Sequence, residues 1–382
     1  MTARTAHPPL TTRQLNRATL ARQLLLDRAH LGVLTAMERI GGLQAQEPAS
    51  PYIGLWTRLT RFAASDLDRA FAERSVVKGT LMRATLHAVS ASDYLDLWPA
   101  VRPMVQAIRR QDRAQAPDAA ALAPLSAAAE AFATEPRGLS EFRAYFGDRE
   151  GMDADEVVWR LRRAVAFIHA PDAVPWSFGR RPRIVHAPAW LGGQDWPDEA
   201  IAIERLSRRY LGAFGPATAA DIAQWSGLAI GRLRPGIAAI DETGDLRRFS
   251  DDRGRELLDL DGAPLPDDDT PAPPRLLGMW DSTLLAFADR TRLISDEDRR
   301  VVIARNGDTL PTFTVGGVVA GLWWAEPDGS GSRIVIEPVR QPFDVADARA
   351  LELESERLAE LIGPLEPAVY KRYQRWRPGR GI

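Results

Sequence analysis

Apolar residues in the first part of the chain recur every three or four positions, which is typical of helices that bury one face. This pattern runs from Thr12 to Leu26, after a threonine pair able to cap a helix. Three more helices are predicted over 33–40, 51–59 and 65–74. The next stretch, "VVKGTLMRATLHAVS" (76–90), is rich in β-branched residues on both sides of a glycine and predicts two short strands. Helices followed by a hairpin are typical of a winged-helix unit.

The same order of elements recurs twice further along the chain. Helices are predicted over 139–147 and 153–170, and a strand, turn and strand over 176–188. A third round has helices from 200 onward, over 217–228 and over 229–237, before a wing-like turn near 242–250. No literal sequence repeat accompanies this similarity of pattern. We therefore predict an α+β fold, mainly helical, of three tandem winged-helix units over 1–125, 126–195 and 196–262.

The remaining residues, 263–382, are predicted to form a β-rich segment that follows a loop rich in Pro and Asp (259–276). Its clearest element is a hairpin in "PTFTVGGVVAGLWWAE" (311–326), where two β-rich runs meet at Gly316 and Gly317, as a two-residue primed turn requires. A strand over 332–339 and a final helix over 345–361 follow.

Composition narrows the class of protein. The chain has 382 residues, 45% of them apolar, which suffices for a buried core. The sequence contains no run of 18 apolar residues, so no membrane span is expected. The N-terminal stretch lacks the apolar region of a secretory signal. With no cysteine and five scattered histidines, we expect neither disulfides nor a metal site, and no cofactor. The expectation is a cytoplasmic protein.

Charge is unevenly distributed, although the net charge is only −2. The stretch 159–183 carries six arginines against Asp172 alone, and the chain has only two lysines, Lys78 and Lys371. This preference for arginine fits GC-rich codon usage, and it also fits phosphate recognition, because the guanidinium matches phosphate geometry. A basic groove on a nearly neutral protein remains compatible with DNA binding.

Two glutamines stand out in "GGLQAQEPAS" (41–50). Gln44 and Gln46 are separated by one residue, so in an extended segment they share one side. Two amides cannot ionise, yet a pair can hold one water in a fixed orientation through donors and acceptors. That is weak catalysis, which suffices only for a good leaving group. The residues alone favour a polar turn between helices over a catalytic pair.

This segment resembles the Gln-apolar-Gln motif of the AlkZ-type bacterial DNA glycosylases, a winged-helix family that excises bulky alkylated bases. Other stretches resemble that family in the same order. They are "KGTLMRATLHAVSASDYLDL" (78–97), "YLGAFGPATAADIAQWSGL" (210–228), "LLGMWDSTLLAFADRTRLI" (276–294) and "NGDTLPTFTVGGVVAGLWW" (306–324). One departure is Trp280, where the family pattern has Phe. The resemblance covers almost the whole chain.

The resemblance implies three winged-helix units in a C shape around duplex DNA, with Gln44 and Gln46 as the catalytic pair. It implies a monomeric, monofunctional glycosylase that hydrolyses the N-glycosidic bond of alkylated purines such as N7-alkylguanine and leaves an abasic site. The residue at position 46 places the chain in the Gln branch rather than in the sister branch with Asp. That branch includes self-resistance enzymes of genotoxin producers, so bulky natural-product adducts or interstrand crosslinks are the expected substrates.

Further residues are candidates for binding duplex DNA that contains alkylated bases. They are Arg58, Lys78, Arg83, His87, Arg160, Arg163, Arg180, Arg183, Arg290, Arg292, Gly316 and Gly317. Several have structural alternatives: His87 as a half-buried histidine, Arg290 and Arg292 as ion-pair partners, and the glycines as a turn. Glu47, beside the motif, is an alternative general base. A winged-helix regulator without catalysis is the rival function.

Overall fold

The computed structural model describes residues 8–108, 119–148, 152–193, 195–304, 307–329, 331–339 and 343–377. Residues 109–118 of the predicted first unit therefore lie outside the described residues. Within the described ranges, no helix is both long enough and apolar enough to cross a membrane.

The N-terminal third forms helices and a hairpin, as predicted. Its helices are α1 (Thr12–Arg22), α2 (Val33–Arg39), α3 (Ala49–Trp56), α4 (Ala64–Ala72) and α5 (Ala91–Ala107), and its hairpin strands are β2 (Val76–Thr80) and β3 (Leu86–Ser90). The Thr11 hydroxyl accepts a hydrogen bond from the Gln14 N–H and so caps α1, which explains why this helix begins after the threonine pair. A short 3₁₀ turn, η1 (Met82–Ala84), connects the two strands.

A six-stranded sheet joins this first part to the next. Its order is β1-β3-β2-β5-β6-β4, and β1 is Leu43–Gln44, β4 is Arg137–Gly138, β5 is Phe167–His169 and β6 is Arg183–His186. Strand β2 pairs antiparallel with β5, with Lys78 opposite His169. Strands from the predicted first and second units thus share one sheet. The predicted boundary between residues 125 and 126 falls inside a helix, α6 (Ala119–Phe132).

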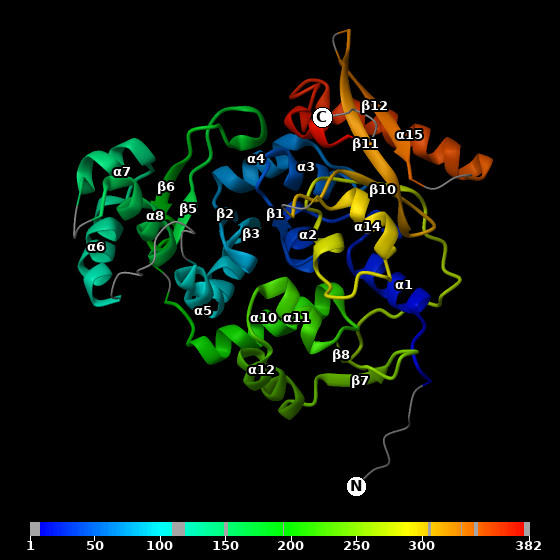
Figure 1. Cartoon of the computed structure of the whole chain (residues 1–382), viewed down its shortest axis with the longest axis horizontal. Helices are drawn as coiled ribbons and strands as arrows, with labels where there is room; N and C mark the ends of the chain where they lie inside the picture. The colour runs from blue at the N-terminus through cyan, green and yellow to red at the C-terminus, as the bar shows by residue number, and fades with distance from the viewer. Residues whose placement is uncertain are drawn as a thin grey trace.

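The second part packs around a small core of its own at the left of Figure 1. Its helices are α6, α7 (Leu139–Phe146) and α8 (Ala154–Ala164). The predicted helix over 153–170 was too long: it ends at Ala164, because the following residues form β5 and pair on both sides within the sheet. Of the two strands predicted over 176–188, only the second is present, as β6. The first is replaced by a 3₁₀ turn, η2 (Pro175–Ser177).

Most of the third part lies in the lower half of Figure 1. It consists of α9 (Ala187–Leu191), α10 (Glu199–Phe214), α11 (Ala219–Ser226), α12 (Ile230–Glu242) and the hairpin β7 (Leu246–Ser250) and β8 (Glu256–Leu260). Helices therefore precede an antiparallel hairpin three times along the chain. Whether these are winged-helix units in a C shape stays a prediction.

The C-terminal part contains a four-stranded sheet in the order β12-β11-β10-β9. Its elements are β9 (Arg275–Leu277), α13 (Ser282–Leu285), α14 (Asp296–Val302), β10 (Thr312–Val315), β11 (Val318–Asp328), β12 (Gly331–Pro338), α15 (Val345–Ile362) and a 3₁₀ segment, η3 (Lys371–Trp376). The long β11–β12 hairpin projects at the top of Figure 1, beside α15. The sequence prediction of the Gly316–Gly317 turn is confirmed: Val315 pairs with Val318, and both glycines have positive φ.

Candidate active site and nucleic-acid interface

Two glycines place the Gln-apolar-Gln segment at the edge of the six-stranded sheet. Gly41 and Gly42 have φ of +76° and +82°, a region that glycine adopts without strain. A Cβ atom on Gly42 would lie 2.6 Å from Cγ1 of Val89, so the chain passes closely along β3. After this turn, β1 pairs with β3 and sets Gln44 opposite His87.

Gln44 is buried and held by a guanidinium. Its side chain is only 5% exposed, and its Oε1 accepts a hydrogen bond from Nη2 of Arg83 at 2.9 Å. Arg83 also donates from Nη1 to the carbonyl oxygen of Trp225 at 2.6 Å. Burial lowers the pKa of Arg83 to about 10, which leaves it charged at neutral pH. Arg83 was predicted to contact DNA, but both terminal nitrogens of its guanidinium are bound within the protein.

Gln46 is exposed, and its oxygen is also fixed by a protein donor. The backbone N–H of Leu86 donates to Gln46 Oε1 at 2.8 Å, while the N–H of Ala45 donates to the carbonyl of Leu86 at 2.7 Å. Because a fixed donor faces each carboxamide oxygen, the orientations of both side-chain amides are determined. Each oxygen keeps a second lone pair, and each nitrogen can still donate.

The two glutamines have different surroundings. Gln46 is part of the wall of an open cleft of about 1530 Å³, whereas Gln44 faces Arg83 and is not among the residues that line this cleft. The cleft lies between the six-stranded sheet, the loop that leads from β5 to β6, and the C-terminal segment. Its wall includes Gln46, Glu47, Lys78, Leu86, His169, Asp172, Trp176, Phe178, Arg180, Glu366, Tyr370 and Arg372.

Glu47 is held by the C-terminal segment. Its carboxylate forms an ion pair with Arg372 and accepts a hydrogen bond from the hydroxyl of Tyr373 at 3.1 Å. This carboxylate lines the same cleft as Gln46, so a charged group does lie beside the motif. Its occupied oxygen makes it a weaker candidate for a general base than an unpaired carboxylate.

Lys78 lies on the cleft wall but is almost fully buried. Its side chain is 4% exposed, and its ammonium sits 4.4 Å from the centre of the Phe178 ring. Burial lowers the pKa of this amine to about 8. The neighbouring His169 has a pKa lowered well below its usual value by burial and by the charge of Lys78.

His87, predicted as a phosphate or lesion contact, is a buried neutral imidazole. It is 1% exposed, and its Nδ1 lies 3.0 Å from the carbonyl oxygen of Thr85, which requires the proton on Nδ1. Burial, and secondarily the charge of Arg83, lower its pKa to about 3. The prediction of a phosphate contact is wrong for this conformation, because the ring is inaccessible and uncharged.

Two of the predicted DNA-binding arginines are part of the core. Arg58 has no exposed surface and forms a two-pronged ion pair with Asp281, with both N–O distances at 2.8 Å. Arg292 is 6% exposed and donates to the carbonyl of Pro216 at 3.0 Å. These two predictions are wrong, because buried and paired guanidinium groups cannot reach a phosphate. Arg290 is half-buried and donates to its own turn.

The arginine-rich stretch 159–183 divides into two groups. Arg160 pairs with Glu156 within α8, and Arg163 stacks 3.7 Å from the ring centre of Trp159, so both are half-buried. Arg162 is half-buried as well, whereas Arg180, Arg181 and Arg183 are exposed. Arg180 lines the cleft, and Arg183 donates one hydrogen bond to the carbonyl of Pro136 at 2.9 Å. Only the second group presents its guanidinium groups to solvent in the way that phosphate binding needs.

The predicted DNA-probing turn packs against the protein itself. Gly317 is buried, and its carbonyl accepts a hydrogen bond from the side chain of Asn16 on α1 at 2.8 Å. Arg17 donates to the carbonyl of Gly316 at 3.1 Å. Gly317 is thus held within the protein, whereas Gly316 is exposed, and a contact of this turn with DNA stays a prediction. The β11–β12 hairpin projects, and its Pro327 lines the cleft.

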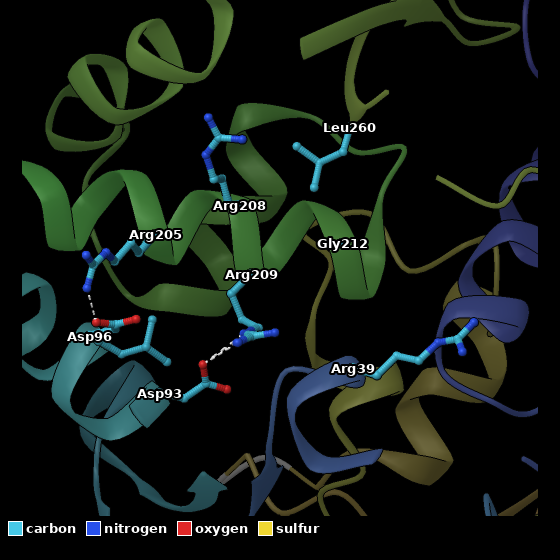
Figure 2. A pocket seen from close by; sticks show the side chains of 9 residues that line it. Arg39, Asp93, Asp96, Arg205, Arg208, Arg209, Gly212 and Leu260 are labelled. Carbon is cyan, nitrogen blue, oxygen red and sulfur yellow. Dashed lines mark hydrogen bonds and ion pairs between the residues drawn. The ribbon is translucent and has the colours of Figure 1, made fainter. Parts of the chain in front are cut away.

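An arginine-rich pocket of about 450 Å³ lies between α5 and α10 and also contains two carboxylates. Figure 2 shows Arg205 and Arg209 of α10 directed at Asp96 and Asp93 of α5. Arg209 Nη2 lies 2.5 Å from Asp93 Oδ1. Arg205 and Arg209 are therefore paired with carboxylates across the contact between α5 and α10, and Arg208 pairs with Glu204 and Asp245.

The family model for AlkZ-like DNA glycosylases matches residues 37–361. The chain belongs to the AlkZ-like DNA glycosylase family. Among solved structures, the Streptomyces sahachiroi DNA glycosylase AlkZ is similar, with 18% sequence identity and a TM-score of 0.74. The alignment covers 94% of this chain and 98% of that one. No curated protein sequence matches the chain significantly.

Membership in this glycosylase family decides between the two rival functions. The chain is an enzyme of the DNA glycosylase class, and the reading as a non-catalytic regulator is withdrawn. Among the residues that the structure describes, no group of three or more potential ligands could hold a metal ion.

Sequence reasoning missed two features of this AlkZ-like site. Arg83 was assigned to DNA, yet it holds Gln44. Lys78 and His169 come from distant segments and meet only through the pairing of β2 with β5. The β-branched residues around Lys78 predicted the strand, but they could not identify its neighbour in the sheet.

Proposed function

We propose that this protein hydrolyses the N-glycosidic bond of alkylated purines in duplex DNA, with N7-alkylguanine as the substrate class. The observation that supports this proposal is the position of Gln46. Its exposed carboxamide is oriented by the Leu86 N–H and lies on the wall of an open cleft. Alkylation at N7 makes the base cationic, so it leaves without needing a proton from a general acid. An enzyme for such a substrate needs to orient water and stabilise the sugar cation.

The proposed chemistry follows from the groups present. As the bond to the base breaks, the sugar becomes an oxocarbenium ion. Gln46 orients the attacking water at the cleft wall. Gln44, buried and fixed by Arg83, is proposed to complete the catalytic pair beside it. The nucleophile for excision is therefore water and not an amine, so that the excision step is monofunctional and leaves an abasic site.

The shape of the cleft favours a bulky lesion. The cleft is open to solvent and measures about 1530 Å³, which exceeds the pockets of about 300–1,000 Å³ that take a small ligand. We propose that natural-product adducts, and crosslinks between strands, enter it without full extrusion of the nucleotide. A role in DNA repair or in self-resistance to a genotoxin follows from that substrate class.

The DNA is proposed to run past the exposed arginines beside this cleft. Arg180 lines the cleft and Arg183 is exposed on β6. We further propose that the three groups of helices and hairpins act as winged-helix units around the duplex, that the protein works as a monomer, and that it acts in the cytoplasm on nucleoid DNA.

An excision assay tests this proposal. A duplex with one N7-alkylguanine is incubated with enzyme, and the abasic product is converted to a strand break by alkali. Gln46→Ala is expected to reduce the rate by about 100- to 1000-fold, the usual cost of losing an oriented hydrogen-bonding group. Gln106→Ala, an exposed glutamine on α5, is the matched control. Equal rates for Gln46→Ala and wild type on a substrate that the wild type excises would refute the assignment.

A further inference from the structure

Lys78 is an unusual residue for its position. The chain has only two lysines, Lys78 and Lys371, against 47 arginines, since Lys and Arg together number 49. One of the two is buried on a central strand of the six-stranded sheet and still lines the cleft that contains Gln46. Arginine, unlike lysine, cannot supply a neutral amine, so this position differs chemically from the rest of the basic surface.

The sheet register relates Lys78 to the candidate active site. Lys78 lies opposite Ala88 of β3, and Leu86, two residues along the same strand, holds the Gln46 carboxamide from the other edge of β3. Lys78, Leu86 and Gln46 all line the cleft. Lys78 and Gln46 therefore lie on the two sides of β3 and border the same cleft.

The surroundings of Lys78 suit a nucleophilic amine. Among the described residues, no carboxylate forms an ion pair with its ammonium, which rests on the Phe178 ring instead. Desolvation lowers the pKa to about 8, so at pH 8 about half of the molecules carry the neutral amine. The other titratable or charged groups that line the cleft are Glu47, His169, Asp172, Arg180, Glu366, Tyr370, Lys371 and Arg372.

We propose that Lys78 captures the abasic-site product as a Schiff base and cleaves the DNA on its 3′ side by β-elimination. This inference rests on the proposed function, because excision supplies the abasic site. It extends that function by a lyase step, which the expectation of a monofunctional enzyme did not include. Water still excises the base, and the amine acts only on the ring-opened sugar aldehyde.

The step balances with groups on the cleft wall. The Nζ lone pair attacks the aldehyde carbon C1′, and uptake of one proton from solvent with loss of one water gives an iminium ion. His169, directly opposite Lys78 in the β2–β5 register and neutral because its pKa is lowered, accepts the C2′ proton. The electrons of the C2′–H bond form a C2′–C3′ double bond, and the C3′–O bond breaks to release the phosphate. Water then hydrolyses the iminium ion and regenerates the amine.

Borohydride trapping on a preformed abasic site tests the proposal independently of excision. A duplex with one uracil is converted to an abasic site by a uracil glycosylase, which is then removed. The full-length protein is added with borohydride, and the covalent adduct is mapped by peptide mass. We expect one adduct, on Lys78, and a strand break without alkali in the absence of borohydride. The rate should rise about fivefold between pH 7 and pH 8, as the neutral fraction of an amine with a pKa of about 8 does.

Matched variants complete the test. Lys78→Met keeps the length and apolar stem of the side chain and should abolish the adduct, whereas Lys371→Met, which removes the exposed lysine of the same cleft, should trap like the wild type. Absence of any adduct in the wild type, or an adduct only on Lys371 or the N-terminal amine, would overturn the proposal. Mapping of the wild-type adduct decides the matter even if Lys78→Met folds poorly. A positive excision assay with a negative trap would leave the proposed glycosylase intact and remove only the lyase.

Discussion

Arg83 and Gln44 are joined by a hydrogen bond of 2.9 Å from the guanidinium to the carboxamide oxygen. Arg83 occupies a left-handed backbone conformation, with φ of +53°, in the turn between β2 and β3. Its second nitrogen is tied to the carbonyl of Trp225 on α11. One arginine thus fixes a candidate catalytic amide to two different parts of the fold, and its positive charge polarises that amide.

Arg83 is accordingly predicted to be a positioning residue. Arg83→Lys keeps the charge but cannot donate to both Gln44 and Trp225. Loss of a hydrogen bond to a charged group costs about 1.5–3 kcal/mol, so we expect a fall in kcat of about 10- to 100-fold. Single-turnover excision measures kcat, and a DNA titration measures binding. A role in DNA contact alone would instead raise KM and leave kcat unchanged, and Arg349→Ala, on the exposed face of α15, is the control.

DNA affinity is predicted to depend on Arg180 and Arg183 and not on Arg58. Each phosphate contact that is neutralised contributes roughly 0.9 to the slope of log affinity against log salt. Arg180→Ala and Arg183→Ala should each reduce the slope by about that amount, because both guanidinium groups are exposed. Fluorescence titrations of duplex DNA at several salt concentrations measure the slope. An unchanged slope in both variants would place the duplex elsewhere.

Structure that depends on neighbouring residues was predicted correctly from the sequence. Structure that depends on contacts with residues far along the chain was not. Gly316 and Gly317 predict a two-residue turn because few other residues adopt positive φ, and the turn forms. Arg58 was predicted to be a surface residue because it is charged. Its buried partner, Asp281, lies 223 residues away along the chain, so no local sequence signal predicts their ion pair. The end of α8 was missed for the same reason, since Phe167–His169 leaves the helical pattern only to pair with β2.

The candidate site shows the same division. The Gln-apolar-Gln spacing and its glycines located β1 and its edge position from local signals. The burial of Gln44, the exposure of Gln46 and the anchoring of each oxygen depend on β3 and its preceding turn, some forty residues further on. In an ideal strand, residues two positions apart, such as Gln44 and Gln46, point to the same face of the sheet. Strand β1 ends at Gln44, so Gln46 lies outside the sheet.

The ion pair between Arg58 and Asp281 is predicted to stabilise the fold. Removing one partner leaves an unpaired charge in the core, which costs about 3–5 kcal/mol. We expect Arg58→Ala and Asp281→Ala each to lower the unfolding free energy by that amount in urea denaturation. The double variant Arg58→Met with Asp281→Leu should lose less than the sum, because no charge remains unpaired. Additive losses would show that the two charges do not interact.

The two glycines of the β10–β11 turn provide a matched comparison. Both have positive φ, +59° for Gly316 and +87° for Gly317, but only a Cβ on Gly317 would collide with α1, at 2.7 Å from atoms of Asn16 and Arg17. Gly316→Ala should cost about 1–2 kcal/mol, the cost of the left-handed conformation alone. Gly317→Ala should cost more, and excision per folded molecule should be unchanged in both. A loss of excision without a loss of stability would place the turn at the DNA interface.

Acid stability is predicted to depend on His87. The pKa of His87 is about 3 in the folded protein and near 6.5 in an unfolded chain. Between these two values the unfolded chain therefore binds a proton that the folded protein does not. The resulting stability is complete above pH 6.5 and is lost progressively as the pH falls toward 3. Between pH 7 and pH 5 this single group should remove about 2 kcal/mol, at 1.4 kcal/mol for each pH unit below 6.5. His87→Gln, which cannot take a proton, should flatten the dependence by that amount, whereas His30→Gln, at an exposed histidine, should not. Urea denaturation at pH 5, 6 and 7 measures how the unfolding free energy depends on pH in the wild type and in each of the two variants. Equal slopes for His87→Gln and the wild type would mean that the ring takes up its proton in the folded state, which would return His87 to the list of candidate phosphate contacts.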